Sequence, residues 1–308
     1  MKTNIFFPFL TILLTLFGIL SACKKENDNE KINIYATKKG TEKSSVYNVS
    51  PIAGNSNSGD EDGTGPAAKF ANITDLAVCA EGILYAYDNA KVKKVSDKGE
   101  VRTISKNMPD ANPFFNEEGG ITVVNGHIYV AGWQSIYRVS TKGKISKFLD
   151  LVGDDRPFVN LGDLTSDEQG NIFSVESSGL IKKIVTPKKT WSDYLNSGHL
   201  WASITYSKGN IYLLDIQGRV YKVSPAGEPI LIYTSESQTG SDIAVAKDGT
   251  LYVLDADKIK KINPQGIASH ELKDKTGKAF WGTQITLGKN DKVMYITNGL
   301  KIGKVQLY

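Results

Sequence analysis

The feature that most constrains this chain is a unit of 39 to 44 residues that recurs six times. Each unit contains a short apolar segment, a turn with glycine, a second segment with an aromatic residue and a third segment with a basic residue. The aromatic residues that mark the period are Tyr85, Tyr129, Phe173, Tyr212, Tyr252 and Tyr295. Such a period predicts an array of like supersecondary units in one domain.

Within a unit, the alternation of apolar and polar residues indicates short antiparallel strands. The first turn usually ends in glycine, which tolerates the positive φ of a tight hairpin. These turns are Glu81-Gly82, Asn125-Gly126, Gln169-Gly170, Lys208-Gly209 and Asp248-Gly249. Four-stranded repeats of this length are typical of propeller blades. The sequence therefore predicts an all-β fold, a six-bladed β-propeller of four-stranded antiparallel blades over residues 44–308.

The sixth unit ends at Tyr308, after its third strand. Residues 45–49 (Ser-Val-Tyr-Asn-Val) form a strand-like segment outside the units. Because an incomplete blade leaves an open sheet edge, we expect this N-terminal strand to close the ring by pairing with the last blade.

The first unit carries a family resemblance. Residues 52–54 (Ile-Ala-Gly), the glycine-rich run 62–70 (Asp-Gly-Thr-Gly-Pro-Ala-Ala-Lys-Phe) and residues 75–78 (Asp-Leu-Ala-Val) resemble the NHL-repeat consensus. The resemblance is partial in the other five units and covers residues 46 to 308. It implies a β-propeller but no single activity, since NHL proteins bind proteins or RNA, act as extracellular sensors, or act as lyases and lactonases.

The N-terminus reads as a targeting signal. Lys2 precedes an apolar run over residues 5–20, which is shorter than the roughly 20 residues of a membrane span. The run ends in Leu-Ser-Ala-Cys, which resembles a bacterial lipobox and implies cleavage after residue 22 and acylation of Cys23. The alternative is an ordinary signal peptide with an incidental cysteine.

These features predict a signal peptide over residues 1–22 and an acylated, polar tether over residues 23–43. The acidic patch after Cys23 resembles the surface-export signal of Bacteroidetes-type lipoproteins, although a plain solvated linker has the same composition. We expect a bacterial cell-envelope protein, anchored by lipid in the outer membrane and surface-exposed. The lipid anchor would be its only membrane contact. Such an anchor suffices, because several acyl chains hold a protein stably.

Charge and cysteine usage narrow the expected partners. The formal net charge is +4, and lysines and acids are interspersed, so nucleic acid is not an expected partner. One basic residue per unit should lie round the outside, with its stem packed and its head in solvent: Lys94, Arg138, Lys183, Lys222, Lys261 and Lys304. Cys79 should be a buried small side chain. We expect the protein to be a monomer.

Propeller ligands usually bind on the face formed by the loops before each inner strand and the turns between the second and third strands. The first positions hold Asp75, Gly120, Asp163, Ser203, Asp242 and Gln284. The second positions hold Asp88, Trp133, Glu176, Asp215, Asp255 and Asn298, and Glu118 precedes the second unit. These acids favour either a divalent cation such as calcium, held by Asp75, Asp163 and Asp242, or the bonding of turn N–H groups.

Three tryptophans and one histidine are also expected on this face. Trp133, Trp201 and Trp281 could stack on sugars or peptide side chains, or cover the core. His199 is the only histidine expected near the face, and no two histidines have a zinc-site spacing. The sequence has no Gly-x-Ser-x-Gly element and no phosphate-binding glycine loop.

Two functions of different class follow. The first is a binding module for a protein, peptide or glycan, with no catalytic residue. The alternative is a metal-dependent hydrolase or lyase similar to the gluconolactonase-like six-bladed propellers. That resemblance implies a divalent cation held by Glu, Asn and Asp, for which Asp75, Asp163, Asp242, Glu118 and Asn298 are candidates without a residue-by-residue motif match.

Overall fold

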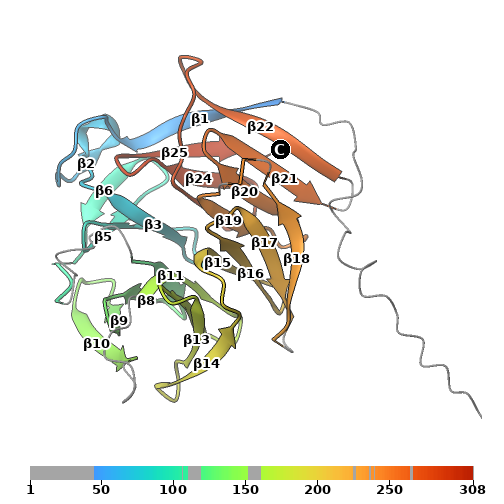
Figure 1. Ribbon diagram of the computed structural model, residues 1–308. Helices are drawn as coiled ribbons and strands as arrows, with labels where there is room; N and C mark the ends of the chain where they lie inside the picture. The colour runs from blue at the N-terminus through green and yellow to red at the C-terminus, as the bar shows by residue number, and fades with distance from the viewer. Residues whose placement is uncertain are drawn as a thin grey trace, which may run out of the picture.

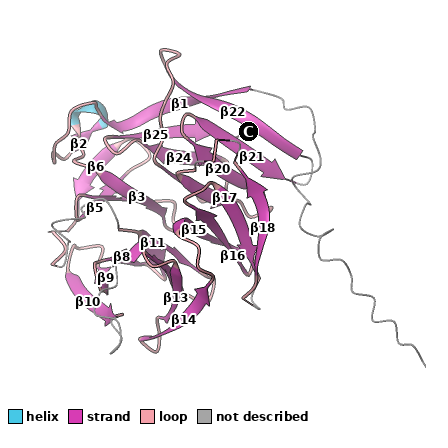
Figure 2. Cartoon of the chain, viewed as in Figure 1, coloured by secondary structure: helices cyan, strands magenta, loops and turns pink. Residues whose placement is uncertain are grey.

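The computed structural model describes residues 45–105, 107–109, 119–151, 161–224, 227–235, 237–238, 240–263 and 266–307. Regular structure in these residues is almost entirely β-strand, with one short 3-10 helix, Gly65–Ala67 (Figure 2). The described residues contain no helix with the length and apolar character needed to cross a bilayer. The strands form antiparallel sheets arranged as a ring, which is a β-propeller (Figure 1).

The first four units each form their own sheet, in chain order. Blade 1 contains β3 (Ile73–Val78), β4 (Leu84–Asp88), β5 (Lys91–Val95), β6 (Glu100–Thr103) and the short β2 (Gly63–Thr64) on its outer edge. Blade 2 contains β7 (Ile121–Val124), β8 (His127–Ala131), β9 (Ser135–Val139) and β10 (Ile145–Asp150). Blade 3 contains β11 (Leu161–Ser166), β12 (Ile172–Glu176), β13 (Leu180–Val185) and β14 (Thr190–Asn196). Blade 4 contains β15 (Trp201–Ser207), β16 (Asn210–Asp215), β17 (Arg219–Val223) and β18 (Pro229–Thr234).

The last two units share one eight-stranded sheet with the order β19-β20-β21-β22-β1-β25-β24-β23. Its strands are β19 (Asp242–Val245), β20 (Leu251–Asp255), β21 (Lys258–Asn263), β22 (Gly266–Asp274), β23 (Gln284–Leu287), β24 (Val293–Thr297), β25 (Lys301–Gln306) and β1 (Ser45–Gly54). The described strands therefore pair into five sheets, not the six separate sheets that the repeats predict. The difference arises because β1 joins the fifth and sixth sets of strands.

The two halves of β1 have different partners. Its second half, from Ser50 to Gly54, pairs antiparallel with β25, so the predicted closure on the last blade is confirmed. Its first half, from Ser45 to Val49, pairs parallel with β22 instead. Residues 45–49, which the sequence predicts to pair with the last blade, therefore pair with the fifth set of strands instead of the sixth. A ten-residue strand is long enough to cover both open edges (Figure 1).

The six inner strands β3, β7, β11, β15, β19 and β23 pack side by side in this order, and β23 contacts β3. They enclose a central channel of about 250 Å³. Apolar side chains fill the spaces between adjacent sheets, for example Leu214 and Val220 of blade 4 against Ile243 and Val253 of the next sheet. The predicted burial of Cys79 is confirmed, since its exposed fraction is 6%.

Candidate functional site

A cavity of about 410 Å³ lies at the end of the channel where the chain enters the inner strands. We call it the mouth cavity. It is lined by Thr74, Asp75, Gly119, Gly120, Gly162, Asp163, Val175, Glu176, Ser177, Leu200, Trp201, Ala202, Ile216 and Gln284. The candidates Asp75, Asp163, Glu176, Trp201 and Gln284 are thus brought together, while Glu118 lies outside the described residues.

Three aspartates tie neighbouring inner strands together in pairs. Asp75 accepts hydrogen bonds from the N–H of Leu76 at 2.6 Å and from the N–H of Ile121, on the next blade, at 2.7 Å. Asp163 does the same with Leu164 at 2.7 Å and Ile204 at 2.8 Å. These carboxylates therefore join β3 to β7 and β11 to β15.

Asp242 makes the third such connection. It accepts from the N–H of Ile243 at 2.8 Å and from that of Ile285 at 2.7 Å, which joins β19 to β23. The hydroxyl of Ser203 also donates to Asp242, at 2.5 Å. Asp242 lines the central channel but not the mouth cavity, whereas Asp75 and Asp163 line both.

Burial raises the pKa of all three carboxyls because water no longer solvates the charged form. The pKa of Asp163 rises to about 6 and that of Asp242 to about 8. The pKa of Asp75 rises well above its ordinary value through burial, then repulsion from Asp163 and Asp242. The hydrogen bonds from backbone N–H groups oppose these shifts. The group of three therefore carries a proton at neutral pH.

The geometry does not form the predicted metal site. Among the residues that the structure describes, no three or more His, Cys, Asp or Glu side chains are placed to hold a metal ion. Calcium takes about six to eight oxygen ligands. Asp75, Asp163 and Asp242 instead direct their oxygens to backbone N–H groups.

The acids in the turns between second and third strands have partners of their own. Asp88 and Glu176 each face a buried lysine, Lys93 at 3.4 Å and Lys182 at 3.1 Å. In the fifth unit Lys260 is buried at the corresponding position, and Asp255 accepts from the hydroxyls of Ser235 and Ser237, at 2.8 Å each. In the fourth and sixth units Asp215 and Asn298 accept from backbone N–H groups of their own turns.

The buried lysines were not found from the sequence. They occur in alternate units, immediately before the periodic basic residue, where the other units have Tyr137, Tyr221 and Gly303. Lys-Lys pairs in the first, third and fifth units are the signal that could have indicated them. The alternation of apolar and polar residues along a strand could not indicate the buried lysines, because neighbouring blades cover both faces of each blade.

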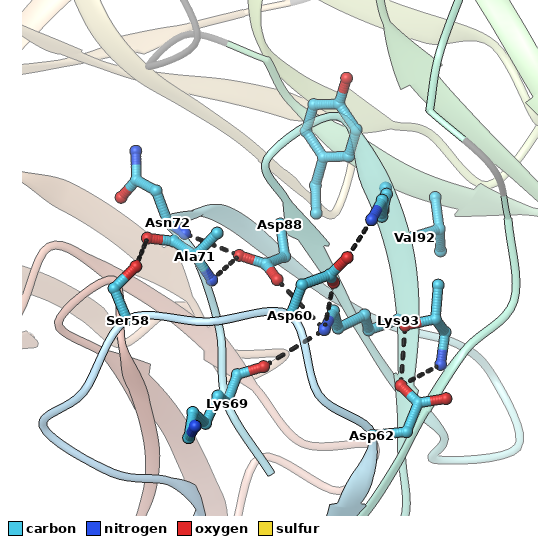
Figure 3. A network of polar contacts seen from close by, with 12 residues as sticks. Ser58, Asp60, Asp62, Lys69, Ala71, Asn72, Asp88, Val92 and Lys93 are labelled. Atoms are coloured by element: carbon cyan, nitrogen blue, oxygen red, sulfur yellow. Dashed lines mark hydrogen bonds and ion pairs between the residues drawn. The ribbon is translucent and has the colours of Figure 1, made fainter.

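In blade 1 the buried lysine holds the preceding loop (Figure 3). The ammonium of Lys93 lies 2.8 Å from Asp60 Oδ1 and donates to the Lys69 carbonyl at 3.2 Å. Asp60 also pairs with Lys91. Asp88 accepts from the N–H groups of Ala71 and Asn72, at 2.9 and 2.8 Å. These contacts fix the loop of residues 58–72 against the sheet.

The aromatic candidates divide into exposed and buried residues. Trp133 and Trp281 are 37% and 63% exposed. Trp201 is only 7% exposed and its Nε1 donates to the Gly179 carbonyl at 2.9 Å, which corresponds to the alternative in which the ring covers the core. His199 packs on the rings of Trp201 and Tyr221.

Two exposed apolar residues of the mouth cavity were missed from the sequence. Leu200 directly precedes β15, and Ile216 lies in the turn between β16 and β17. Their exposed fractions are 47% and 58%. An isoleucine in the tight turn Asp-Ile-Gln-Gly, where polar residues are usual, is the signal that could have been used.

No protein-family model matches the sequence, and no curated protein matches it. Among solved structures, a protein of unknown function from Bacteroides thetaiotaomicron has a TM-score of 0.69 at 18% identity, over 85% of this chain and 76% of that chain. A gluconolactonase from Xanthomonas campestris has a TM-score of 0.62 at 12% identity, over 78% and 87%. A calcium-binding protein, regucalcin, from Agrobacterium tumefaciens has a TM-score of 0.63 at 12% identity, over 85% and 96%.

At these sequence identities, the similarity supports a shared fold alone. The chain shares the propeller architecture of gluconolactonase- and regucalcin-like proteins, with four-stranded antiparallel blades. The NHL repeat and the lipoprotein signal stay predictions from the sequence.

Proposed function

We propose that the chain is an enzyme, a hydrolase or lyase that acts on a small molecule in the mouth cavity by acid–base chemistry. The observation that carries this proposal is Asp163, which borders the cavity and whose pKa is raised by burial to about 6. A carboxyl with a pKa near neutrality both takes up and returns a proton efficiently. Each carboxylate oxygen has two lone pairs, so its backbone hydrogen bond leaves a second acceptor position.

The fold comparison supports an enzyme ahead of a pure binding module. One similar structure is described as a gluconolactonase, which is a hydrolase. Fold alone does not decide activity, so the proposal depends on the carboxyls of the cavity. We also infer that the ring is six-bladed and of NHL type, with β1 shared between the fifth and sixth blades.

Hydrolysis of a lactone or ester illustrates the chemistry. The Asp163 carboxylate takes a proton from water as the water oxygen attacks the carbonyl carbon. The carbon–oxygen bond to the leaving alcohol then breaks, and the proton returns to that leaving oxygen. In a lyase reaction the same carboxylate takes a proton from carbon, the bond from the neighbouring carbon to the leaving group breaks as the double bond forms, and the proton is returned to the leaving group.

The divalent cation implied by the gluconolactonase-like resemblance does not fit the described residues. No set of three or more potential side-chain ligands occurs among them, and the Lys182 ammonium lies 3.1 Å from Glu176, the remaining acid of the cavity. No step of the proposed chemistry therefore runs through a metal.

A panel of lactones, aryl esters and elimination substrates tests the proposal, with the matched variants Asp163→Asn and Asp242→Asn. Both aspartates join two inner strands, so the variants should lose similar stability. Of these two aspartates, only Asp163 borders the mouth cavity, so Asp163→Asn should lower kcat/KM by about a hundredfold or more. Equal activity of the two variants would overturn the proposed role of Asp163.

A second candidate is a binding module for a protein, peptide or glycan, and the exposed rings of Trp133 and Trp281 favour it. Exposed aromatic side chains supply large contact areas at interfaces. No turnover on the panel, together with capture of a peptide or glycan that Trp281→Ala abolishes, would select this function.

We further propose that the propeller is held in the bacterial cell envelope by lipid on Cys23, which lies outside the described residues. The lipobox-like ending of the apolar run supports this proposal. Radiolabelled palmitate should enter the wild-type chain and not Cys23→Ser. Equal labelling of both chains would contradict the anchor.

A further inference from the structure

The residues that line the mouth cavity are of two chemical kinds. Asp75, Asp163 and Glu176 carry carboxyls. Leu200 and Ile216 carry exposed apolar side chains. Concave sites with an apolar lining and a few placed polar groups are typical of small-molecule binding.

A further lining residue, Gly162, leaves space open in this cavity. Gly119 and Gly120 also line the cavity, but an added Cβ would lie 2.5 Å from the Tyr87 ring and 2.4 Å from the Leu164 nitrogen, respectively. Packing therefore explains those two glycines. At Gly162 the only atom near an added Cβ is the Val175 carbonyl oxygen at 3.8 Å, and φ is not positive.

Neither packing nor backbone conformation thus requires glycine at position 162. Glycine inside a strand is destabilising relative to alanine. The absence of a side chain there enlarges the mouth cavity beside Asp163. A ligand that approaches the backbone of β11 accounts for the choice of residue.

The charge of the acidic lining residues indicates which ligand fits. Of the three acids, Glu176 faces the Lys182 ammonium, which is also bonded to Asp193 at 3.0 Å and lies over the Trp191 ring. Asp75 and Asp163 accept hydrogen bonds from backbone N–H groups. Burial, with repulsion from Asp163 and Asp242, raises the pKa of Asp75, so a positive charge beside these carboxyls would be favourable. A ligand that brings a cation supplies that charge.

We propose that the mouth cavity binds an amphipathic organic cation, with its ammonium group at Asp75 and Asp163 and its apolar part between Gly162 and the side chains of Leu200 and Ile216. The volume of about 410 Å³ lies at the lower end of small-molecule sites and fits a ligand of modest size. Turnover of such a ligand rests on the proposed function, but its binding does not.

Three probes of similar shape test the charge preference: 2-phenylethylammonium, 2-phenylethanol and 3-phenylpropanoate. Binding to the propeller is measured by ligand-observed NMR and calorimetry at pH 7. We expect the ammonium probe to bind in roughly the millimolar range, as suits a fragment of this size. The neutral alcohol should bind at least about fivefold more weakly, and the anion not at all. Equal or tighter binding of the alcohol or the anion would overturn the proposal.

Two variants, one of them with a matched control, locate the site. Gly162→Leu fills the open space and should reduce binding of the ammonium probe by about tenfold or more, with the melting temperature nearly unchanged. Ile216→Ser should weaken binding about fivefold, whereas Ile230→Ser, which alters an exposed isoleucine on β18, should not. Unchanged binding in Gly162→Leu would overturn the placement.

The two proposals fail in different ways. Binding of the ammonium probe with no turnover on any panel substrate would remove the enzyme and keep the cation site. Turnover of neutral lactones with no preference for the ammonium probe would keep the enzyme and remove the cation site.

Discussion

At the scale of single residues, a buried ammonium group holds the loop before the first blade. Lys93 is fully buried and contacts the carboxylates of Asp60 and Asp88. Charges without a partner are costly in the interior, and breaking a buried ion pair by removing one member destabilises proteins by about 3–5 kcal/mol. The Lys93 ammonium therefore stabilises the folded position of Asp60 and Asp88.

We expect Lys93→Met to lower the free energy of unfolding by about 3–5 kcal/mol, because the buried Asp88 carboxylate loses its cation, while Asp60 keeps its pair with Lys91. Lys94→Met is the matched control, since Lys94 is exposed on the same strand and should change stability by less than about 0.5 kcal/mol. Chemical denaturation gives both values. Similar values for the two variants would show that the buried contacts of Lys93 do not hold the loop.

The raised pKa values of the channel aspartates make stability depend on pH. The folded-state pKa of Asp242, about 8, lies above its ordinary value of 3.8, so the folded protein binds this proton more tightly than the unfolded chain. The stabilisation is complete below pH 3.8 and is lost as pH rises through about 8. Between pH 7 and pH 9, Asp242 alone should lower the free energy of unfolding by on the order of 1.4 kcal/mol.

Urea denaturation at several pH values measures this effect. The window avoids His270, whose pKa is lowered by burial and which acts in the opposite direction below its ordinary value of 6.5. Asp242→Asn removes this titrating group and should reduce the slope of the profile between pH 7 and 9. A wild-type stability that is constant or rises with pH across that window would contradict the raised pKa.

From the sequence, the location of a residue at one end of the ring is predictable, because it depends only on the residue's position within its repeated unit. The spacing of the units located Asp75, Asp163 and Glu176 at one cavity because equivalent positions of a ring meet at one end. Hydrogen bonds to the next blade, such as Asp75 to Ile121, were not predictable because they depend on how adjacent strands align in space. The same holds for Gly162, whose importance appears only when the surrounding space is known.

At the scale of elements, β1 is the strand that completes the ring. It buries Val49 and Ala53, and Val49 packs so closely on Gly303 that an added Cβ at residue 303 would lie 2.2 Å from it. Hydrogen bonds to both β22 and β25 connect it to two sets of strands. Its loss would expose two strand edges at once.

Two truncated chains test this role, one beginning at residue 45 and the other at residue 55. We expect the chain without β1 to melt roughly 10 °C or more below the chain that keeps it, because the lost strand removes two pairings and buried apolar area. Thermal scans by circular dichroism measure the difference. Equal melting temperatures would mean that β1 does not close the ring.

The strand pattern of the units was predictable because glycine turns and alternation act locally. The double pairing of β1 was not, since nothing in residues 45–54 specifies which edge each half meets. Pro51, which cannot donate to a ladder, precedes the register shift on β25. The choice between β22 and β25 is set by the positions of the two edges in the closed ring.

At the scale of the whole molecule, the ring combines repeated units with an alternating pattern. The first, third and fifth units each carry an inner aspartate bonded to the next blade and a buried lysine. The ring is therefore connected by these aspartates as three pairs of neighbouring inner strands. The arrangement buries three carboxyls near the axis, and burial raises their pKa values, with repulsion adding to the shift at Asp75 and Asp242. Among the described residues these carboxyls do not assemble a set of metal ligands.

That difference gives a whole-molecule prediction about calcium, since a similar structure is described as calcium-binding. A specific ion at a hundred times its Kd stabilises a protein by about 2.7 kcal/mol, which would raise the melting temperature by roughly 5 °C or more. Because the described residues offer no ligand set, we expect the melting temperature and the activity to be unchanged by excess calcium or by chelator. A stoichiometric metal in elemental analysis, with a rise of this size that Asp163→Asn abolishes, would show instead that the axial carboxylates bind a cation and would replace the proton-based chemistry of the mouth cavity.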